Sequence, residues 1–166
     1  MLHVILYRPE LASNTGNIMR TCAAIGAKLH VIGPFSFSLF GKEVVRAAMD
    51  YGSMLEVKVY DDYSSFIEDN HHPDLWMVSR YGHTVFSEAD FGGPAPIYIM
   101  FGSESSGIPL EILRENTRKT LRIPMVPSAR SLNLSNSVAV VAYEIMRQKG
   151  YENLARTEVL KGPDYL

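Results

Sequence analysis

Apolar runs of strand length alternate along this chain with segments of helical length, and this alternation limits the possible folds more than any other feature. The expected strands are residues 3–7, 28–32, 55–60, 75–79, 97–101 and 121–125, and the expected helices are residues 15–25, 42–49, 63–69, 110–118 and 131–149. Strands that alternate with helices usually form a largely parallel sheet that helices cover on both faces. We therefore predict an α/β fold, with residues 1–150 as a single domain and residues 151–166 as a loosely attached C-terminal tail.

The composition indicates a globular protein and argues against several functional classes. Of the 166 residues, 46% are hydrophobic and 20% are charged, and no apolar run approaches the roughly 20 residues that a membrane-spanning helix needs. The single cysteine, Cys22, excludes an internal disulfide framework and a cysteine-cluster metal site, and the five histidines show no metal-ligand spacing. We therefore expect a cytoplasmic protein without membrane segments and without a metal site.

The net charge of −2 argues against a strongly basic nucleic-acid-binding protein, but the basic residues are unevenly distributed. One basic group falls between Arg114 and Arg130, and a second, looser group comprises Arg20, Lys42 and Arg46. Either group by itself is typical of a solvated helix face. If both groups line one face of the protein, that face can bind an RNA backbone.

Three polar segments follow predicted strands, at the carboxyl ends where parallel sheets bind their ligands. They are NTGNIMR at residues 14–20, GSESSG at residues 102–107, and IPMVPSARSLNLSNSVAVVAYE at residues 123–144. In the third segment, residues 131–136 include several small polar side chains of the types that cap helices or bind ligands. An apolar stripe at helical spacing follows them and indicates a packing surface. The glycine patterns of dinucleotide-binding folds and of P-loops do not occur in this sequence.

In this order and at these spacings, the three segments resemble the three motifs of the SPOUT superfamily of S-adenosylmethionine-dependent RNA methyltransferases. The resemblance covers residues 1 to about 150 and is strongest to the small bacterial members that consist of the catalytic domain alone. It implies a deep trefoil knot in the C-terminal part of the domain, and a homodimer packed largely through the first and last helices, with each active site using both subunits. For the single-domain form it implies methylation of the ribose 2'-hydroxyl of the wobble nucleotide, a cytidine or uridine, in leucine tRNAs.

The resemblance also implies which residues bind S-adenosylmethionine. By motif position, the cofactor pocket falls on Val78, Gly102, Ile123, Met125 and Ser131. The cofactor needs a close-fitting pocket with backbone donors and acceptors for its adenine and ribose, and Ile123 and Met125 would supply apolar walls. Gly102 would allow the backbone to approach the ligand closely, because glycine has no side chain.

The same motif positions assign catalysis to Arg20, Glu104 and Asn133. The family counterpart of Arg20 is credited with activating the 2'-hydroxyl, but a guanidinium has a pKa above ~12 and accepts protons poorly. We interpret Arg20 instead as a group that binds the adjacent RNA phosphate and stabilises the developing alkoxide. Glu104 would orient Arg20 or the target nucleotide, and Asn133 would hold the ribose or the methionine end of the cofactor.

Four further positions complete the expected site. Asn14, Arg46 and Arg130 are expected to bind RNA or to shape the site, and Tyr143, on the last helix, is expected at the dimer interface. For Asn14, the alternative is an ordinary turn or cap residue. For Tyr143, the alternative is packing within its own chain.

Two other functions are compatible with parts of the sequence. Residues 103–107 come close to the G-x-S-x-G turn of serine hydrolases, with a predicted strand before them and a predicted helix after them. However, Ser103 replaces the first glycine, and no histidine follows this turn in the order that a catalytic triad of this type needs. A non-catalytic RNA-binding dimer of the same fold would be expected to lack Arg20, Glu104 or Asn133, and all three residues are present.

Overall fold

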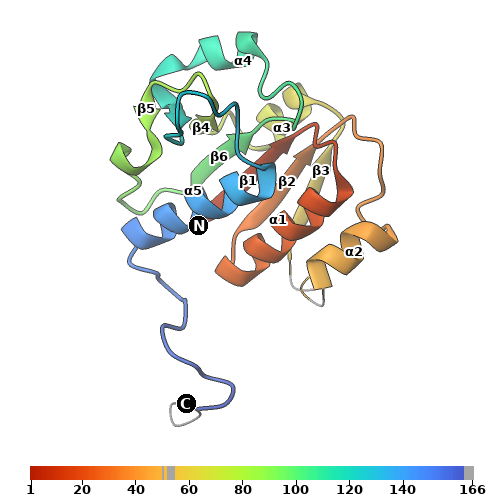
Figure 1. Ribbon diagram of the computed structural model, residues 1–166, viewed down its shortest axis with the longest axis vertical. Coiled ribbons are helices and arrows are strands. Elements are labelled where there is room, and N and C mark those ends of the chain that lie inside the picture. The colour runs from red at the N-terminus through yellow and green to blue at the C-terminus, as the bar shows by residue number, and fades with distance from the viewer. Residues whose placement is uncertain (50, 52–54, 163–166) are drawn as a thin grey trace.

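A computed structural model describes residues 1–49, 51 and 55–162, and within them the chain forms one parallel sheet covered by helices (Figure 1). The strands are β1 (Leu2–Tyr7), β2 (Lys28–Ile32), β3 (Val57–Tyr60), β4 (Leu75–Val78), β5 (Thr84–Val85), β6 (Ile97–Phe101) and β7 (Thr120–Arg122). Their order across the sheet is β3-β2-β1-β6-β4-β7-β5, and every neighbouring pair is parallel. The predicted α/β fold with a mostly parallel sheet is therefore confirmed. Residues 163–166 of the predicted tail lie outside the described residues.

Helices cover both faces of this sheet. They are α1 (Ala12–Ile25), α2 (Lys42–Ala48), α3 (Tyr63–Asp69), α4 (Leu110–Glu115) and α5 (Leu134–Gln148), together with the short 3-10 helices η2 (Phe86–Glu88) and η3 (Thr117–Lys119). Successive residues of a strand point to opposite faces, so Val4 and Leu6 of β1 join a core with α1 and α5, whereas Ile5 joins a core with α3 and α4. All three side chains are fully buried, and burying one such aliphatic side chain stabilises the fold by about 1.5–3 kcal/mol.

The segment between β7 and α5 differs from the prediction at both ends. β7 ends three residues earlier than predicted, because Pro124 has no N–H group with which to continue the hydrogen-bond ladder. α5 begins three residues later than predicted, because the Asn133 side chain caps it by accepting from the backbone N–H groups of Ser135 (2.9 Å) and Asn136 (3.3 Å). Residues 123–133 therefore form an irregular segment at the carboxyl edge of the sheet.

Other elements differ in smaller ways; β3 begins two residues later than predicted, and β4 and α2 each end one residue earlier. β5 is absent from the predicted strands, because it has only two residues and no apolar run marks it. α1 begins at Ala12 rather than at residue 15, but it ends at Ile25 as predicted, and Gly26 caps it. α4 ends at Glu115, before the predicted residue 118, and η3 follows it directly.

Strand order and chain threading are separate properties of this fold. β4 lies between β6 and β7, so the chain crosses over repeatedly on that side of the sheet. The deep trefoil knot that the resemblance implies depends on threading, which strand order does not decide, and it stays a prediction. Among the described helices, none has the length and apolar character to cross a membrane.

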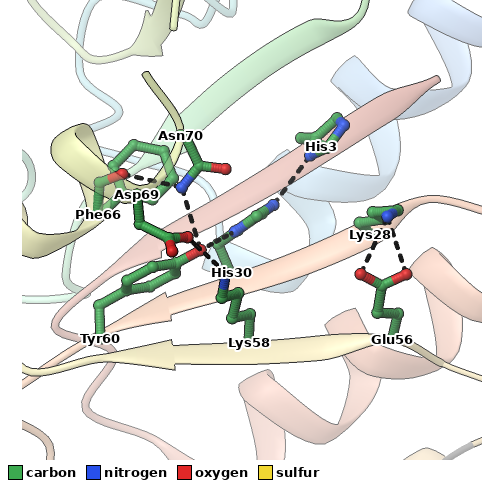
Figure 2. Close-up of polar contacts among 9 residues, drawn as sticks. All are labelled: His3, Lys28, His30, Glu56, Lys58, Tyr60, Phe66, Asp69 and Asn70. Carbon is green, nitrogen blue, oxygen red and sulfur yellow. Dashed lines mark hydrogen bonds and ion pairs between the residues drawn. The ribbon is translucent and has the colours of Figure 1, made fainter. Parts of the chain in front are cut away.

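A buried polar network lies on the face of the sheet that α3 covers (Figure 2). His3 Nδ1 lies 2.9 Å from His30 Nε2, and His30 Nδ1 lies 2.9 Å from the Tyr60 hydroxyl. That hydroxyl donates to Asp69 at 3.2 Å and accepts from the Asn70 amide at 3.0 Å. If Tyr60 donates to Asp69, then His30 donates from Nδ1 and accepts at Nε2 from His3, so the network assigns both imidazoles a neutral form protonated at Nδ1.

Candidate active site

Three polar side chains, one from each of the predicted motifs, form a continuous chain of hydrogen bonds near the carboxyl edge of the sheet. Asn133 Nδ2 donates to Asn14 Oδ1 at 2.9 Å, and Asn14 Nδ2 donates to Glu104 Oε1 at 2.9 Å. The paired residues are separated by 119 and 90 positions in the sequence. The Glu104–Asn14–Asn133 chain is therefore where the three predicted polar segments meet.

Further contacts hold each member of the Glu104–Asn14–Asn133 chain in one orientation. The Glu104 carboxylate also accepts from the backbone N–H groups of Glu10 (2.8 Å) and Leu11 (3.3 Å), just before α1. Asn133 Oδ1 accepts from the first turn of α5, so its Nδ2 is left to donate to Asn14. Asn14 is buried and uses both ends of its amide. A buried amide bonded at both ends loses hydrogen bonds if it rotates, so this chain fixes the starts of α1 and α5 relative to the loop after β6.

Arg20, the expected catalytic residue, does not join this hydrogen-bond chain within the described structure. It follows Asn14 by six residues on α1, which places it about 9 Å further along the helix axis and about 120° around it. Its side chain is exposed, and its guanidinium carbon lies 5.8 Å from the centroid of the Tyr51 ring. Glu104 binds Asn14 and the start of α1 instead, so the expected orientation of Arg20 by Glu104 is not found within this chain.

Three of the five expected cofactor residues come together at the ends of neighbouring strands. Val78 ends β4, and its partners in the sheet are Phe101 of β6 and Leu121 of β7. Gly102 directly follows the first of these partners, and Ile123 follows the second by two residues. Val78 and Ile123 are only partly buried against the core, so both leave apolar surface accessible. An apolar strand edge of this kind fits the adenine of S-adenosylmethionine.

The other two expected cofactor residues lie in the irregular segment 123–133. Met125 is partly buried and Ser131 is exposed. Between them the segment turns, with the Ala129 N–H donating to the Val126 carbonyl at 2.9 Å. Both expected residues therefore lie on the stretch that connects the apolar strand edge to the cap of α5.

Gly102 makes the close backbone approach that glycine permits, but its neighbour is the protein's own chain. A Cβ atom at Gly102 would lie 2.0 Å from the carbonyl carbon of Gly107 and 2.1 Å from the nitrogen of Ile108. The Gly107 N–H donates to the Ser103 carbonyl at 3.0 Å and closes the turn. The turn that presents Glu104 therefore requires glycine at position 102.

The remaining expected residues lie on exposed surface, outside the Glu104–Asn14–Asn133 chain. Arg46 lies in the last turn of α2, and Arg130 lies in the segment before α5. Both side chains are exposed. Tyr143 is 46% exposed on α5, so the alternative of packing within its own chain accounts for only part of its surface.

α5 has two apolar faces of different kinds. One face is buried against the chain's own core and comprises Leu134, Val138, Val141, Ala142, Ile145 and Met146. Val140 and Tyr143 are 41% and 46% exposed. The apolar stripe read from the sequence therefore belongs mainly to the intramolecular core, and these two residues are the ones left for a partner.

Glu10 is a polar residue at this site that the motifs do not include. Its backbone N–H binds Glu104, and its Oε1 accepts from the Ser105 hydroxyl at 2.5 Å. Its position a few residues after a strand, at the ligand-binding edge, is the feature that could have identified it. The same contact argues against the hydrolase alternative, because Ser105 pairs with a carboxylate rather than with a histidine, while the Ser103 and Ser106 hydroxyls bond each other at 2.7 Å.

A parallel α/β sheet whose polar loops meet at one edge defines a protein that binds its ligand at the carboxyl ends of the strands. Comparison with known proteins identifies the family within this class. Residues 1–143 match the model of the SpoU rRNA Methylase family. The chain belongs to that family.

Individual relatives agree with this assignment over nearly the whole chain. The tRNA (cytidine(34)-2'-O)-methyltransferase of Escherichia coli strain K12 is 41% identical over 152 residues, which cover 91% of this chain and 96% of that protein. A solved structure concerning 2-OH methylation of C/U34 on tRNA superposes with a TM-score of 0.82 at 38% identity, covering 90% of this chain and 97% of that chain. The SpoU methyltransferase AviRb from Streptomyces viridochromogenes, in complex with AdoMet, superposes with a TM-score of 0.77 at 26% identity, covering 90% of this chain and 60% of that chain. The predicted resemblance to RNA 2'-O-methyltransferases is confirmed.

Proposed function

We propose that this protein transfers a methyl group from S-adenosylmethionine to the ribose 2'-hydroxyl of nucleotide 34, the wobble nucleotide, of a tRNA. The observation that carries the proposal is the Glu104–Asn14–Asn133 chain, which joins the three motifs in a protein 41% identical to an Escherichia coli enzyme named for this reaction. Methyl transfer requires reacting atoms held in line, and positioning of this kind contributes several kcal/mol to catalysis. A site held together by several hydrogen bonds between its loops, with Asn14 buried at their centre, is suited to that task.

The finer parts of the proposal concern the substrate, the domain and the location. The target is cytidine or uridine at position 34 of leucine tRNAs, and the protein acts in the cytoplasm. Residues 1–150 form the catalytic domain with its trefoil knot, and residues 151–166 form a tail outside the catalytic core. The pyrimidine at position 34 is supported by the names of the relatives, whereas the leucine tRNAs and the knot rest on the motif resemblance, and the tail and the cytoplasmic location rest on the sequence pattern and composition.

Five residues, at the ends of β4, β6 and β7 and in the segment after β7, are proposed to hold the cofactor: Val78, Gly102, Ile123, Met125 and Ser131. When bound, S-adenosylmethionine supplies a methyl group activated by its sulfonium. The partly buried apolar side chains would contact the adenine, and the loop backbone would bind its polar atoms. The segment that carries Met125 and Ser131 leads directly to Asn133, so the cofactor would lie beside the Glu104–Asn14–Asn133 chain.

Arg20 is proposed to bind the phosphate next to the target ribose and to stabilise the charge that develops on the 2'-oxygen. The phosphate or a water molecule accepts the proton, because a guanidinium cannot. Arg20 lies apart from the hydrogen-bond chain of its own subunit, so it serves the site of the partner subunit in a homodimer. Glu104 and Asn133 position the loops around the reacting atoms, and Arg46 and Arg130 bind the RNA backbone.

Nucleoside mass spectrometry of tRNA treated with the protein and labelled S-adenosylmethionine tests the proposed reaction. We expect the label in 2'-O-methylcytidine or 2'-O-methyluridine from position 34. Calorimetry should also show that S-adenosylhomocysteine binds the protein in the absence of RNA. A base-methylated product, or no product from protein that binds the cofactor, would contradict the proposed reaction. The absence of binding at millimolar S-adenosylhomocysteine would contradict the proposed cofactor site.

A homodimer packed through α1 and α5 is part of the proposal, and Tyr143 tests it. Val140 and Tyr143 are exposed on α5, and Leu11, just before α1, is 51% exposed. Replacing Tyr143 with glutamate would bury an unpaired charge in this interface, and such a charge costs several kcal/mol. We expect a largely monomeric variant that has lost methyl transfer. Size-exclusion chromatography with light scattering measures its mass.

Val59→Glu is the control for this experiment. Val59 is 51% exposed on β3, at the edge of the sheet, so glutamate there should leave the dimer intact. Circular dichroism shows whether each variant remains folded. A wild-type protein that is active as a monomer would refute the shared site, and a Tyr143→Glu variant that remains dimeric would remove Tyr143 from the interface.

A further inference from the structure

A cavity of about 510 Å³ adjoins the candidate active site at the carboxyl ends of β1 and β2. Its lining includes Arg8 and Glu10 after β1, Phe35 after β2, and Ser103 and Ser106 after β6. None of the five expected cofactor residues contributes to this lining. Its volume is in the range of pockets that hold small organic ligands, and we refer to it as the Glu10 cavity.

The lining of the Glu10 cavity offers the three kinds of group that bind a nucleotide. Phe35 is only partly buried and presents an aromatic ring, and bases stack on such rings. Arg8 is exposed and supplies a guanidinium that can bind a phosphate. Glu10 is exposed and supplies a carboxylate, which can accept hydrogen bonds from the edge of a base.

The backbone at Arg8 is held in an unusual conformation at this cavity. Its φ angle is 50°, in the left-handed region that residues with long side chains seldom occupy. Two hydrogen bonds to the end of β2 keep it there: the Arg8 N–H donates to the Ile32 carbonyl at 2.8 Å, and Nε donates to the Gly33 carbonyl at 3.3 Å. Backbone strain of this kind concentrates at ligand sites, which agrees with a role for the cavity in binding.

The Glu10 cavity is directly connected to the Glu104–Asn14–Asn133 chain. The Glu10 N–H donates to Glu104 Oε2 at 2.8 Å, and Glu104 Oε1 accepts from Asn14. The Glu10 carboxylate uses Oε1 to accept from the Ser105 hydroxyl. A carboxylate has about four lone-pair positions, so Glu10 retains acceptor capacity for an occupant of the cavity. An occupant that binds Glu10 lies next to the residues assigned to methyl transfer.

We propose that the Glu10 cavity receives the base of the nucleotide that is methylated, with Phe35 stacking on the base and Glu10 accepting a hydrogen bond from its polar edge. This inference rests on the proposed function. A carboxylate can accept from the exocyclic amino group of cytosine or from the ring N–H of uracil, because both are donors. Glu10 is therefore a residue that binds either pyrimidine, which agrees with a structural neighbour concerned with C/U34.

The inference is tested by removing either the acceptor or the donor of the proposed hydrogen bond, which are the Glu10 carboxylate and the amino group of the base. The substrates are two tRNAs that differ only at position 34, where one carries cytidine and the other a cytidine analogue without the exocyclic amino group. We expect wild-type protein to prefer cytidine in kcat/KM by about 10-fold, the size of one specific base contact. The Glu10→Ala variant should show no preference for cytidine. Once the carboxylate is absent, removing the amino group that it binds should cost nothing more, because the effects of removing two contacting groups do not add. The variant keeps the backbone N–H that binds Glu104.

Two control variants separate this contact from indirect effects. Ser105→Ala removes the bond to Glu10 but keeps its carboxylate, so the preference for cytidine should remain. Glu88→Ala removes an exposed carboxylate on η2 and should behave as wild type. Glu10→Gln replaces Glu10→Ala if the latter does not fold, and it should reduce the preference without abolishing it.

The outcomes distinguish this inference from the proposed function. If wild-type protein methylates neither RNA at the 2'-oxygen, the proposed function fails and the inference fails with it. If wild-type protein methylates both RNAs and folded Glu10→Ala retains the cytidine preference, only the inference is overturned. It is also overturned if wild-type protein does not distinguish the two RNAs.

Discussion

Replacing Arg20 with alanine is expected to lower the rate of methyl transfer by about 10²–10³-fold, the usual effect of removing one group that stabilises transition-state charge. Cofactor binding should be nearly unchanged, because the expected cofactor residues lie at the ends of β4, β6 and β7 and in the segment after β7, whereas Arg20 is on α1. Single-turnover rates at saturating tRNA and calorimetry with S-adenosylhomocysteine measure the two effects separately.

Arg156→Ala is the control, because Arg156 is also an exposed arginine and lies in the tail. Its methyl-transfer rate and its cofactor affinity should both remain close to wild type. An equal loss of rate and cofactor affinity in Arg20→Ala would contradict a catalytic role. It would indicate that Arg20 supports the fold of α1 instead.

Mixed dimers show which subunit's site Arg20 serves. One subunit carries Arg20→Ala, and the other carries Asn133→Asp, which we also expect to be inactive. Aspartate at position 133 still caps α5, but it lacks the amide that donates to Asn14. If Arg20 acts across the dimer, one of the two sites in the mixed dimer contains both native residues, Arg20 from one subunit and Asn133 from the other. The mixed dimer should then be active, although neither variant is active by itself. Affinity tags that differ between the two subunits confirm the mixed dimer. A mixed dimer that stays inactive would place Arg20 in the site of its own chain.

The order of strands and helices could be predicted because it depends on local patterns. The run that became β6 is continuously apolar, and those that became β1 and β2 are largely apolar, as expected of strands buried on both faces. The two-residue β5 has no such run. The order of strands across the sheet pairs residues such as Leu2 and Ile97, and no local pattern encodes contacts between residues so far apart.

The residues of the site could be predicted from the sequence, but the hydrogen bonds that join them could not. Asn133 was a candidate by its motif position, and it lies among residues of the types that cap helices or bind ligands; the cap is present. Its bond to Asn14 depends on how α1 and α5 pack, so spacing in the sequence could not indicate it. The same limit applies to Arg20, since the rotation of α1 decides whether its side chain reaches Glu104. Glu10 belongs to none of the three motifs. Its position soon after β1 places it at the ligand-binding edge, but its bonds to Glu104 and Ser105 are seen only in the structure.

Acidification is expected to destabilise the fold through His3 and His30. The pKa of each imidazole is lowered from 6.5 to about 4. Burial is the largest cause for both, and for His30 the neighbouring His3 is the second cause. At pH values between these two pKa values, the unfolded chain binds more protons than the folded chain. The stabilisation is therefore fully present above about pH 6.5 and is lost as the pH falls toward 4. We expect the free energy of unfolding to decrease by an amount on the order of 3 kcal/mol for the coupled pair.

The hydrogen bonds of Figure 2 explain why the folded protein resists protonation of His30. With both rings protonated at Nδ1, His30 Nε2 accepts the His3 proton, and His30 Nδ1 donates to Tyr60. A proton added to His30 Nε2 would face the Nδ1–H group of His3 at 2.9 Å. The pair must then lose a hydrogen bond or separate, and both changes occur in a buried network where unmet polar groups are costly.

A double replacement, His3→Phe with His30→Phe, tests this account without leaving one partner unpaired. Phenylalanine can keep the stacking of His3 on Tyr98 and the edge contact of His30 with Phe66, and replacing both partners of a buried bond by apolar groups is often nearly neutral. Urea unfolding at fixed protein concentration, at about pH 7 and about pH 4.5, should show a smaller pH dependence in this variant than in wild type. His83→Gln changes an exposed histidine and should keep the wild-type dependence. If the double variant keeps it as well, other groups cause the acid sensitivity, and the buried imidazoles do not.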